Sequence, residues 1–172
     1  EPTLGVIGAL ALSGLGFGAY AMARGTLFSR LVLTTALVAL VALHIQLAHG
    51  ELEYHFGVFV TLALLLVYLD WRPIVFAAGL FAVHHVLFDR LQAMGLGFYC
   101  TTEANFWRVM LHAGYVVIQT SLEVVLAVSM GRTAREGVAQ TRGRAAGLPA
   151  RAPAGGAERH ASRHHRRHVG AR

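Results

Sequence analysis

The sequence predicts an all-α polytopic membrane bundle with five transmembrane helices and a disordered basic C-terminal tail. The chain of 172 residues is 55% hydrophobic, which is too apolar for an ordinary soluble domain. Its apolar residues gather in five runs of about the 20 residues that cross a bilayer core. These runs are apolar on nearly every face, whereas the helices of a soluble bundle carry a polar stripe every 3.6 residues.

The five runs follow one another along the chain with short connections, except for RLQAMGLGFYCTTEAN at residues 90–105. The predicted helices cover residues 3–23, 31–48, 53–69, 73–90 and 106–130.

Local signals agree with the ends of these helices. In the motif DWRP, at residues 70–73, an interfacial tryptophan precedes a proline suited to the first turn of a helix. In the first helix, Gly14 and Gly18 form a GxxxG pattern, which allows close contact between membrane helices.

Arginine placement predicts the orientation, because cytoplasmic loops carry an excess of basic residues. Arg24 and Arg30 flank the first turn and Arg72 lies in the third, whereas residues 49–53 contain no arginine. The C-terminus is therefore expected in the cytoplasm, with residues 49–53 and 90–105 outside. Five spans would then place the first residue outside, so we expect a sixth helix upstream of it.

Residues 132–172 differ in composition from the bundle of residues 1–131. They consist mainly of Ala, Arg and Gly without an apolar period, and we expect disorder. A GC-rich gene read out of frame, or truncated, gives the same mixture, so no function is assigned to this tail. Most arginines of the chain lie here without a pattern, and their charge does not indicate binding to nucleic acid.

The stretch HIQLAHGELEYHF, residues 44–56, places ionisable side chains between two apolar runs. Together with histidines of the fourth and fifth predicted helices, they fall at similar depth near the outer side. Ionisable groups at membrane depth are costly and usually face the bundle interior or a wet cavity. The candidate ligand or metal residues are His44, His49, Glu51, Glu53, His55, His84, His85 and His112.

Several kinds of chemistry fit this set. Histidines beside carboxylates suit Zn or Cu, two histidines from facing helices can ligate haem, and a neutral cluster can titrate as a pH sensor. The alternative is that each histidine only forms a hydrogen bond to a neighbouring helix. His84 and His85 lie about 100° apart on a helix and are not expected to share a ligand. Cys100, the single cysteine, either joins a metal site or is a spectator thiol.

The fifth predicted helix carries a polar face. His112, Tyr115, Gln119 and Glu123 share it by spacing, and Glu123 lies about 16 Å along the axis from His112, towards the cytoplasm. Gln119 and Glu123 are therefore candidate signal-relay residues, which could carry protons or transmit strain. An enzymatic activity is not expected, because the sequence has no phosphate-binding loop, nucleophile elbow or HExxH motif.

Four motifs are specific in combination: LHIQLAHGELEYHF, YLDW, HHVLF and LHAGYVV. Through them the sequence resembles the N-terminal multi-helix module of certain bacterial methyl-accepting chemotaxis proteins, which also occurs on some diguanylate cyclases. The resemblance covers about residues 3–130. The matching positions are His44, His49, Gly50, Glu53, His55, Phe56, Phe59, Asp70, Trp71, His84, His85, Phe88, His112, Ala113 and Tyr115.

The resemblance implies a module of six helices in the bacterial inner membrane, joined to a cytoplasmic signalling domain. Chemoreceptor outputs pair, so it also allows a homodimer. After Arg132, however, the chain shows neither heptads nor a catalytic domain. The family often has its acidic residue slightly earlier than Glu123, where this chain has Gln119, and the resemblance names no ligand.

We therefore expect the sensory input module of a chemoreceptor-type transducer, which detects a cue through the His/Glu cluster in the outer half of the membrane. The alternative is a stand-alone membrane protein that binds a metal or haem and handles electrons, protons or metal ions.

Overall fold

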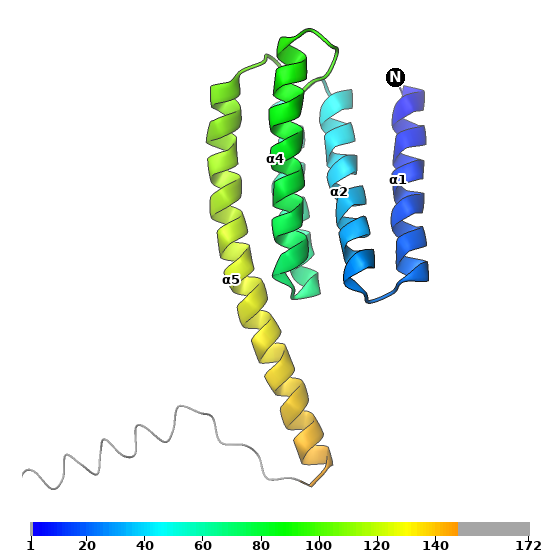
Figure 1. The fold of residues 1–172 in the computed structure, drawn as a ribbon, viewed down its shortest axis with the longest axis vertical. Coiled ribbons are helices and arrows are strands. Elements are labelled where there is room, and N and C mark those ends of the chain that lie inside the picture. The colour runs from blue at the N-terminus through cyan, green and yellow to red at the C-terminus, as the bar shows by residue number, and fades with distance from the viewer. Residues whose placement is uncertain (1, 148–172) are drawn as a thin grey trace, which may run out of the picture. The chain divides into compact units, whose positions relative to one another are not determined.

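A computed structural model describes residues 2–147, and within that range all regular structure is helical. Four helices in this range are long and apolar enough to cross a membrane: α1 (Pro2–Met22), α2 (Leu27–Leu47), α4 (Trp71–Ala93) and α5 (Phe106–Ala145). They lie side by side (Figure 1). The prediction of an all-α bundle built from several long apolar helices is confirmed.

The third apolar run differs from the prediction of a full α-helical span. It forms the 3₁₀ helix η1 (Leu52–His55), the α-helix α3 (Phe56–Leu64) and the 3₁₀ helix η2 (Leu65–Tyr68), which together are shorter than the other four. The run stops at Leu69, whose left-handed φ of 50° breaks the helix. Asp70 then caps α4 by accepting a hydrogen bond from the amide of Arg72 at 3.1 Å.

Two predicted turns lie at the same end of the bundle. The guanidinium of Arg30, in the first turn of α2, lies 3.4 Å from the carboxylate of Asp70, which precedes α4. Asp70 therefore caps α4 and also links it to the α1–α2 turn. The loop of residues 94–105 lies at the opposite end of α4 (Figure 1).

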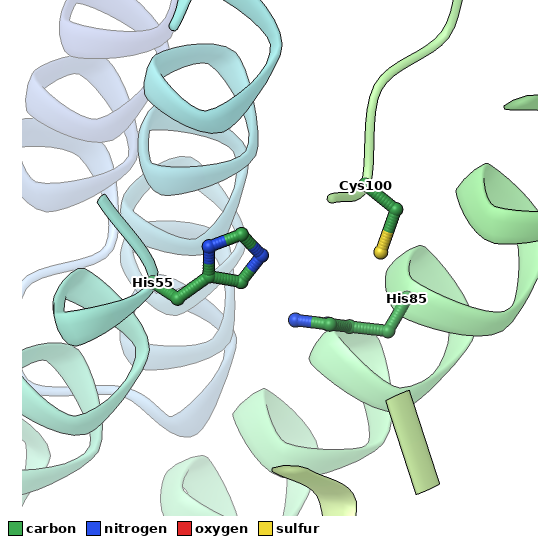
Figure 2. Close-up of side chains that lie close together, drawn as sticks. All are labelled: His55, His85 and Cys100. Carbon is green, nitrogen blue, oxygen red and sulfur yellow. The ribbon is translucent and has the colours of Figure 1, made fainter. Parts of the chain in front are cut away.

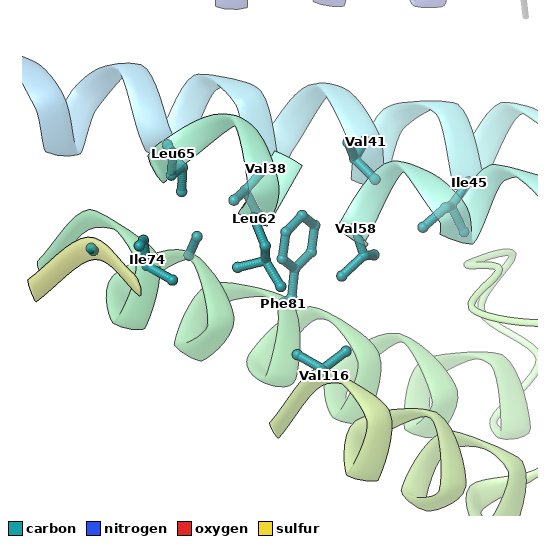
Figure 3. Close-up of a cluster of buried hydrophobic side chains, with 11 residues drawn as sticks. Val38, Val41, Ile45, Val58, Leu62, Leu65, Ile74, Phe81 and Val116 are labelled. Atoms are coloured by element: carbon teal, nitrogen blue, oxygen red, sulfur yellow. The ribbon is translucent and has the colours of Figure 1, made fainter. Parts of the chain in front are cut away.

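The hydrophobic core joins α2, α3, η2, α4 and α5. Phe81 of α4 lies among side chains from α2 and α3 and is 1% exposed (Figure 3). Burial of these side chains removes their apolar surface from water and packs the segments closely against one another. The cluster comprises Val38, Val41, Ile45, Val58, Leu62, Leu65, Ile74, Ala77, Phe81, Val116 and Ala127.

Helix α1 packs on α2 through glycine, but not through the predicted pair. A Cβ atom at Gly5 or Gly8 would lie 2.8 or 3.1 Å from a leucine side chain of α2. A Cβ atom at Gly14 or Gly18 would meet nothing within 4 Å. The GxxxG pair therefore makes no close contact with the part of the chain that the structure describes.

The chain divides into two compact units between Gly131 and Arg132, where the sequence changes composition. Residues 132–145 nevertheless continue α5, although disorder was predicted from Arg132 onward. The reason is local, because Ala, Arg, Glu and Gln in this stretch favour the helix and outweigh its two glycines. The rest of the predicted tail, residues 148–172, lies outside the described residues, as does Glu1.

The topology can be tested with a membrane-impermeant maleimide. Cys100 is fully buried, so its thiol should stay unreactive in the folded protein. Glu103 lies in the same loop and is exposed, so Glu103→Cys should react in intact cells if residues 90–105 are outside. Reaction of Glu103→Cys only after lysis would reverse the predicted orientation, and the wild-type chain is the control.

Candidate functional site

Three histidines from different parts of the bundle meet in its interior. His55 ends η1, His85 lies in α4 and His112 lies in α5. The ring centroids are 5.5 Å apart for His55 and His85, 5.8 Å for His55 and His112, and 5.1 Å for His85 and His112. In these three of the eight predicted candidates, each ring contacts the other two. We call them the histidine cluster.

The backbone fixes which nitrogen of two of these rings carries the proton. Nδ1 of His55 lies 3.1 Å from the carbonyl oxygen of Glu51, and Nδ1 of His85 lies 2.8 Å from that of Phe81. A carbonyl oxygen only accepts, so each Nδ1 donates, and in the neutral ring Nε2 then keeps its lone pair. Metal-binding histidines are commonly held in this tautomer by such a hydrogen bond.

Among residues 2–147, the lone-pair nitrogens have no hydrogen-bond partner. Nε2 of His55 and Nε2 of His85 are buried and unpartnered, on residues that are 4% and 6% exposed. Nε2 of His112 and Nε2 of His84 are also buried and unpartnered. A buried polar atom without a partner costs free energy, so a cluster of them calls for an explanation such as a bound ion or water.

Cys100 completes the group. Its sulfur and one nitrogen each of His55 and His85 all lie within 4.8 Å of one another, and all three residues are buried. Figure 2 shows the thiol and the two imidazoles turned into the same space. Thiolate and imidazole are both ligands of zinc and copper.

Two glutamines hold the Cys100 loop in place. The side-chain oxygen of Gln92, in α4, accepts from the amide of Cys100 at 2.8 Å, and its nitrogen donates to the carbonyl of Thr101 at 2.6 Å. Gln46, in α2, similarly accepts from the amide of Tyr99 at 2.9 Å and donates to the carbonyl of Gly97 at 3.0 Å. These bonds satisfy loop backbone groups that no helix pairs.

The turn after α2 leaves room for this loop. Gly50 has φ +79° and donates its amide to the carbonyl of Ile45 at 2.9 Å, which closes the helix end. A Cβ atom there would lie only 2.4–2.7 Å from backbone atoms of Thr101. The position therefore requires glycine both for its conformation and for the close approach of the loop.

Cys100 lies in an environment that keeps its thiol protonated in the absence of a cation. Burial, and then the nearby carboxylate of Asp89, raise the pKa of Cys100 to about 12. Asp89 is 1% exposed and is bound by the guanidinium of Arg90 at 2.6 Å and by the amide of Asn105 at 3.1 Å. A cation bound at the thiol would take the place of its proton.

A cavity of about 360 Å³ adjoins the histidine cluster. The three cluster histidines line it on one side, and Thr101, Thr102 and Arg108 line it on another. An apolar cavity of about 240 Å³ lies between α4 and α5 and also contacts His85 and His112. Helix α5 therefore packs on α4 less closely than a filled interface would.

The remaining histidine and glutamate candidates are not part of this group, although His84 contacts it. His84 is buried, and its ring packs against Phe88 at 4.2 Å and against His85 at 5.2 Å, but it is outside the His–Cys set. His44, His49, Glu51 and Glu53 are exposed. His49 stacks edge to face on Tyr99 at 4.9 Å, and Glu51 contributes its backbone carbonyl to His55 rather than its carboxylate.

The predicted polar face of α5 exists in part. Gln119 donates to the carbonyl of Phe59 in α3 at 3.1 Å and to Oε1 of Glu123 at 2.6 Å. Glu123 is 5% exposed, and its Oε2 has no partner. Tyr115, placed on this face from its spacing, is instead 60% exposed, because the inward face runs through Val116.

The sequence left open whether Cys100 belongs to a metal site, and it did not point to Gln46 or Gln92. A signal for Cys100 was present, since a thiol downstream of the HH pair and three residues before Glu103 fits a metal set. No sequence signal shows that the glutamine side chains bind loop backbone, because this depends on where the loop returns.

The described residues thus form a helical bundle with four helices long and apolar enough to cross a membrane, and with a buried histidine–cysteine group. No protein-family model, curated protein or solved structure matches this chain.

Two glycine variants test the role of the turn after α2. Gly50→Ala should lower the free energy of unfolding by more than Gly25→Ala, because both residues have φ +79° but only Gly50 faces the backbone of Thr101. The left-handed conformation alone costs alanine roughly 1–2 kcal/mol, which sets the expected loss for Gly25→Ala. Unfolding in detergent measures both, and equal losses would show that the loop does not rest on Gly50.

Proposed function

We propose that this chain is a membrane-embedded sensory input module whose receiving site is the histidine cluster. The observation that carries the proposal is the convergence of buried, unpartnered imidazole nitrogens from η1, α4 and α5. An occupant of the cluster binds nitrogen atoms of three segments at once. It therefore favours one arrangement of these segments over others, which is what a signal requires.

Helix α5 is the segment that the occupant moves. It carries His112, and it continues without a break to Ala145. Its packing against α4 leaves the apolar cavity of about 240 Å³, so a small shift of α5 costs few contacts. The bond from Gln119 to the backbone of α3, and the bond from Gln119 to Glu123, also respond to such a shift.

The geometry favours a single ion over haem as the occupant. The three rings lie at centroid distances of 5.1–5.8 Å, which is direct contact between aromatic rings. A planar macrocycle held by two of them would have to separate these rings and the helices that carry them. An ion binds nitrogen atoms that already lie close together.

The proposal includes five spans. Residues 52–68 contain eight 3₁₀ residues and nine α-helical residues. With rises of about 2.0 and 1.5 Å per residue, this composite run extends roughly 29 Å, close to the thickness of a bilayer core. In this arrangement the C-terminal side of α5 is cytoplasmic in a bacterial inner membrane, and a homodimer is compatible with the module.

The competing function is a stand-alone membrane metal-binding protein that handles electrons or metal ions. The histidine–cysteine group favours it equally, because this group needs no output domain. The two functions differ in whether occupancy of the site alters α5.

Hydrogen–deuterium exchange of the full chain in lipid nanodiscs tests the proposal. Saturating Zn²⁺, Co²⁺ or Cu⁺ should change amide exchange in residues 116–145 of α5 by severalfold, because the occupant restrains His112. His112→Ala should abolish this change, whereas His44→Ala, an exposed histidine of α2, should preserve it. A cation that binds at the cluster and leaves exchange of α5 unaltered would favour the stand-alone function.

A further inference from the structure

We infer that Nε2 of His55, Nε2 of His85 and Sγ of Cys100 form a binding site for one copper(I) ion, with His112 beside them as a further imidazole. The inference rests on the proposed function only in taking the histidine cluster as the receiving site. It adds the thiol as a ligand and names the ion.

The atoms are close enough to form such a site. One ligand atom from each of the three residues lies within 4.8 Å of the other two. Bonds of about 2.0 Å to nitrogen and 2.3 Å to sulfur require ligand atoms roughly 3.3–3.7 Å apart. Side-chain rotation and a small movement of the Cys100 loop provide the remaining closure of about 1 Å. Two imidazoles and one thiolate in a trigonal set are typical of copper.

The oriented rings support a cation rather than another ligand. Both Nδ1 atoms are occupied by backbone carbonyls, which leaves the lone pairs on Nε2 for a cation. Hydrogen bonds from Nδ1 to a carbonyl orient metal-binding histidines in the same way. The thiol itself is held from the other side through the amide of Cys100, which Gln92 binds.

Charge favours a monovalent ion. Cu⁺ bound by two neutral imidazoles and one thiolate gives a site of zero net charge, whereas Zn²⁺ leaves a charge of one. Buried net charge is expensive at membrane depth. The neighbouring charges do not compensate for it, because Asp89, near Cys100, is already paired with Arg90, and Arg108, which lines the cavity, is a cation. Thiolate ligands also favour soft Cu⁺.

Binding is a simple exchange of a proton for the ion. The S–H bond of Cys100 breaks as the Cu–S bond forms, the proton passes to water, and copper keeps its oxidation state. The cavity of about 360 Å³ lined by Thr101, Thr102 and Arg108 gives the ion a path to the cluster.

The test is anaerobic titration of the full chain in nanodiscs with Cu⁺, against a chromogenic Cu⁺ chelator, with X-ray absorption on the loaded protein. One Cu⁺ per chain should bind, with one sulfur and two or three nitrogen ligands. Cys100→Ser and His55→Ala should each weaken binding on the order of 100-fold or more, since even loss of a supporting residue costs 10–100-fold. His44→Ala, an exposed histidine, should bind like the wild type.

X-ray absorption on the copper-loaded wild-type chain tests the inference even if a variant fails to fold. Any of four results would overturn the inference. These are a copper site without sulfur, a Cu⁺ affinity of folded Cys100→Ser equal to that of the wild type, a preference for Zn²⁺ over Cu⁺, and no copper bound. Amide exchange of α5 in the same samples separates this inference from the proposed function. If copper is bound through sulfur and exchange of α5 is unaltered, the copper site stands and the sensory function is contradicted. If exchange of α5 changes and copper is bound only through nitrogen, the sensory function stands and the copper site with Cys100 is contradicted.

Discussion

Two hydrogen bonds within single helical turns govern the chemistry of this bundle. They tie Nδ1 of His55 to the carbonyl of Glu51 and Nδ1 of His85 to the carbonyl of Phe81. Each satisfies one nitrogen of a buried ring and leaves the other nitrogen with a free lone pair. The candidate site therefore consists of bases already oriented before any occupant arrives, which lowers the cost of binding.

The site also depends on how a loop distant from η1 in the sequence reaches His55. Gly50 permits the loop backbone to pass at a distance that any side chain would block. Gln46 and Gln92 then bind its amides and carbonyls, which places the thiol of Cys100 over the two imidazoles. Helix α2 and helix α4 thus position a ligand that neither helix carries. Helix α5 contributes His112, and through it the cluster connects to the longest helix of the described chain.

Hydropathy predicted the long helices because membrane spanning is a property of length and composition, which the sequence displays directly. It placed the third segment within one residue at each end, but it could not show the 3₁₀ turns or the left-handed Leu69, because hydropathy carries no signal for backbone conformation. Depth along the helices placed His55, His85 and His112 at one level, and the structure brings them together. Depth could not exclude His44 from the site, because a helix that is apolar on all faces does not show in its sequence which side faces inward. In the structure His44 is exposed and its neighbour Ile45 is buried. Tyr115 was misplaced for the same reason.

The central claim is that His55 and His85 are neutral bases with free Nε2 lone pairs. Nitrogen-15 NMR of the chain with labelled histidine, in lipid at neutral pH, tests it directly, with His55→Ala and His85→Ala spectra to assign the signals. The account predicts protonated Nδ1 and unprotonated Nε2 at both residues. A proton on Nε2 of either ring, or an imidazolium, would contradict it, because the cluster would then offer no lone pair to a cation.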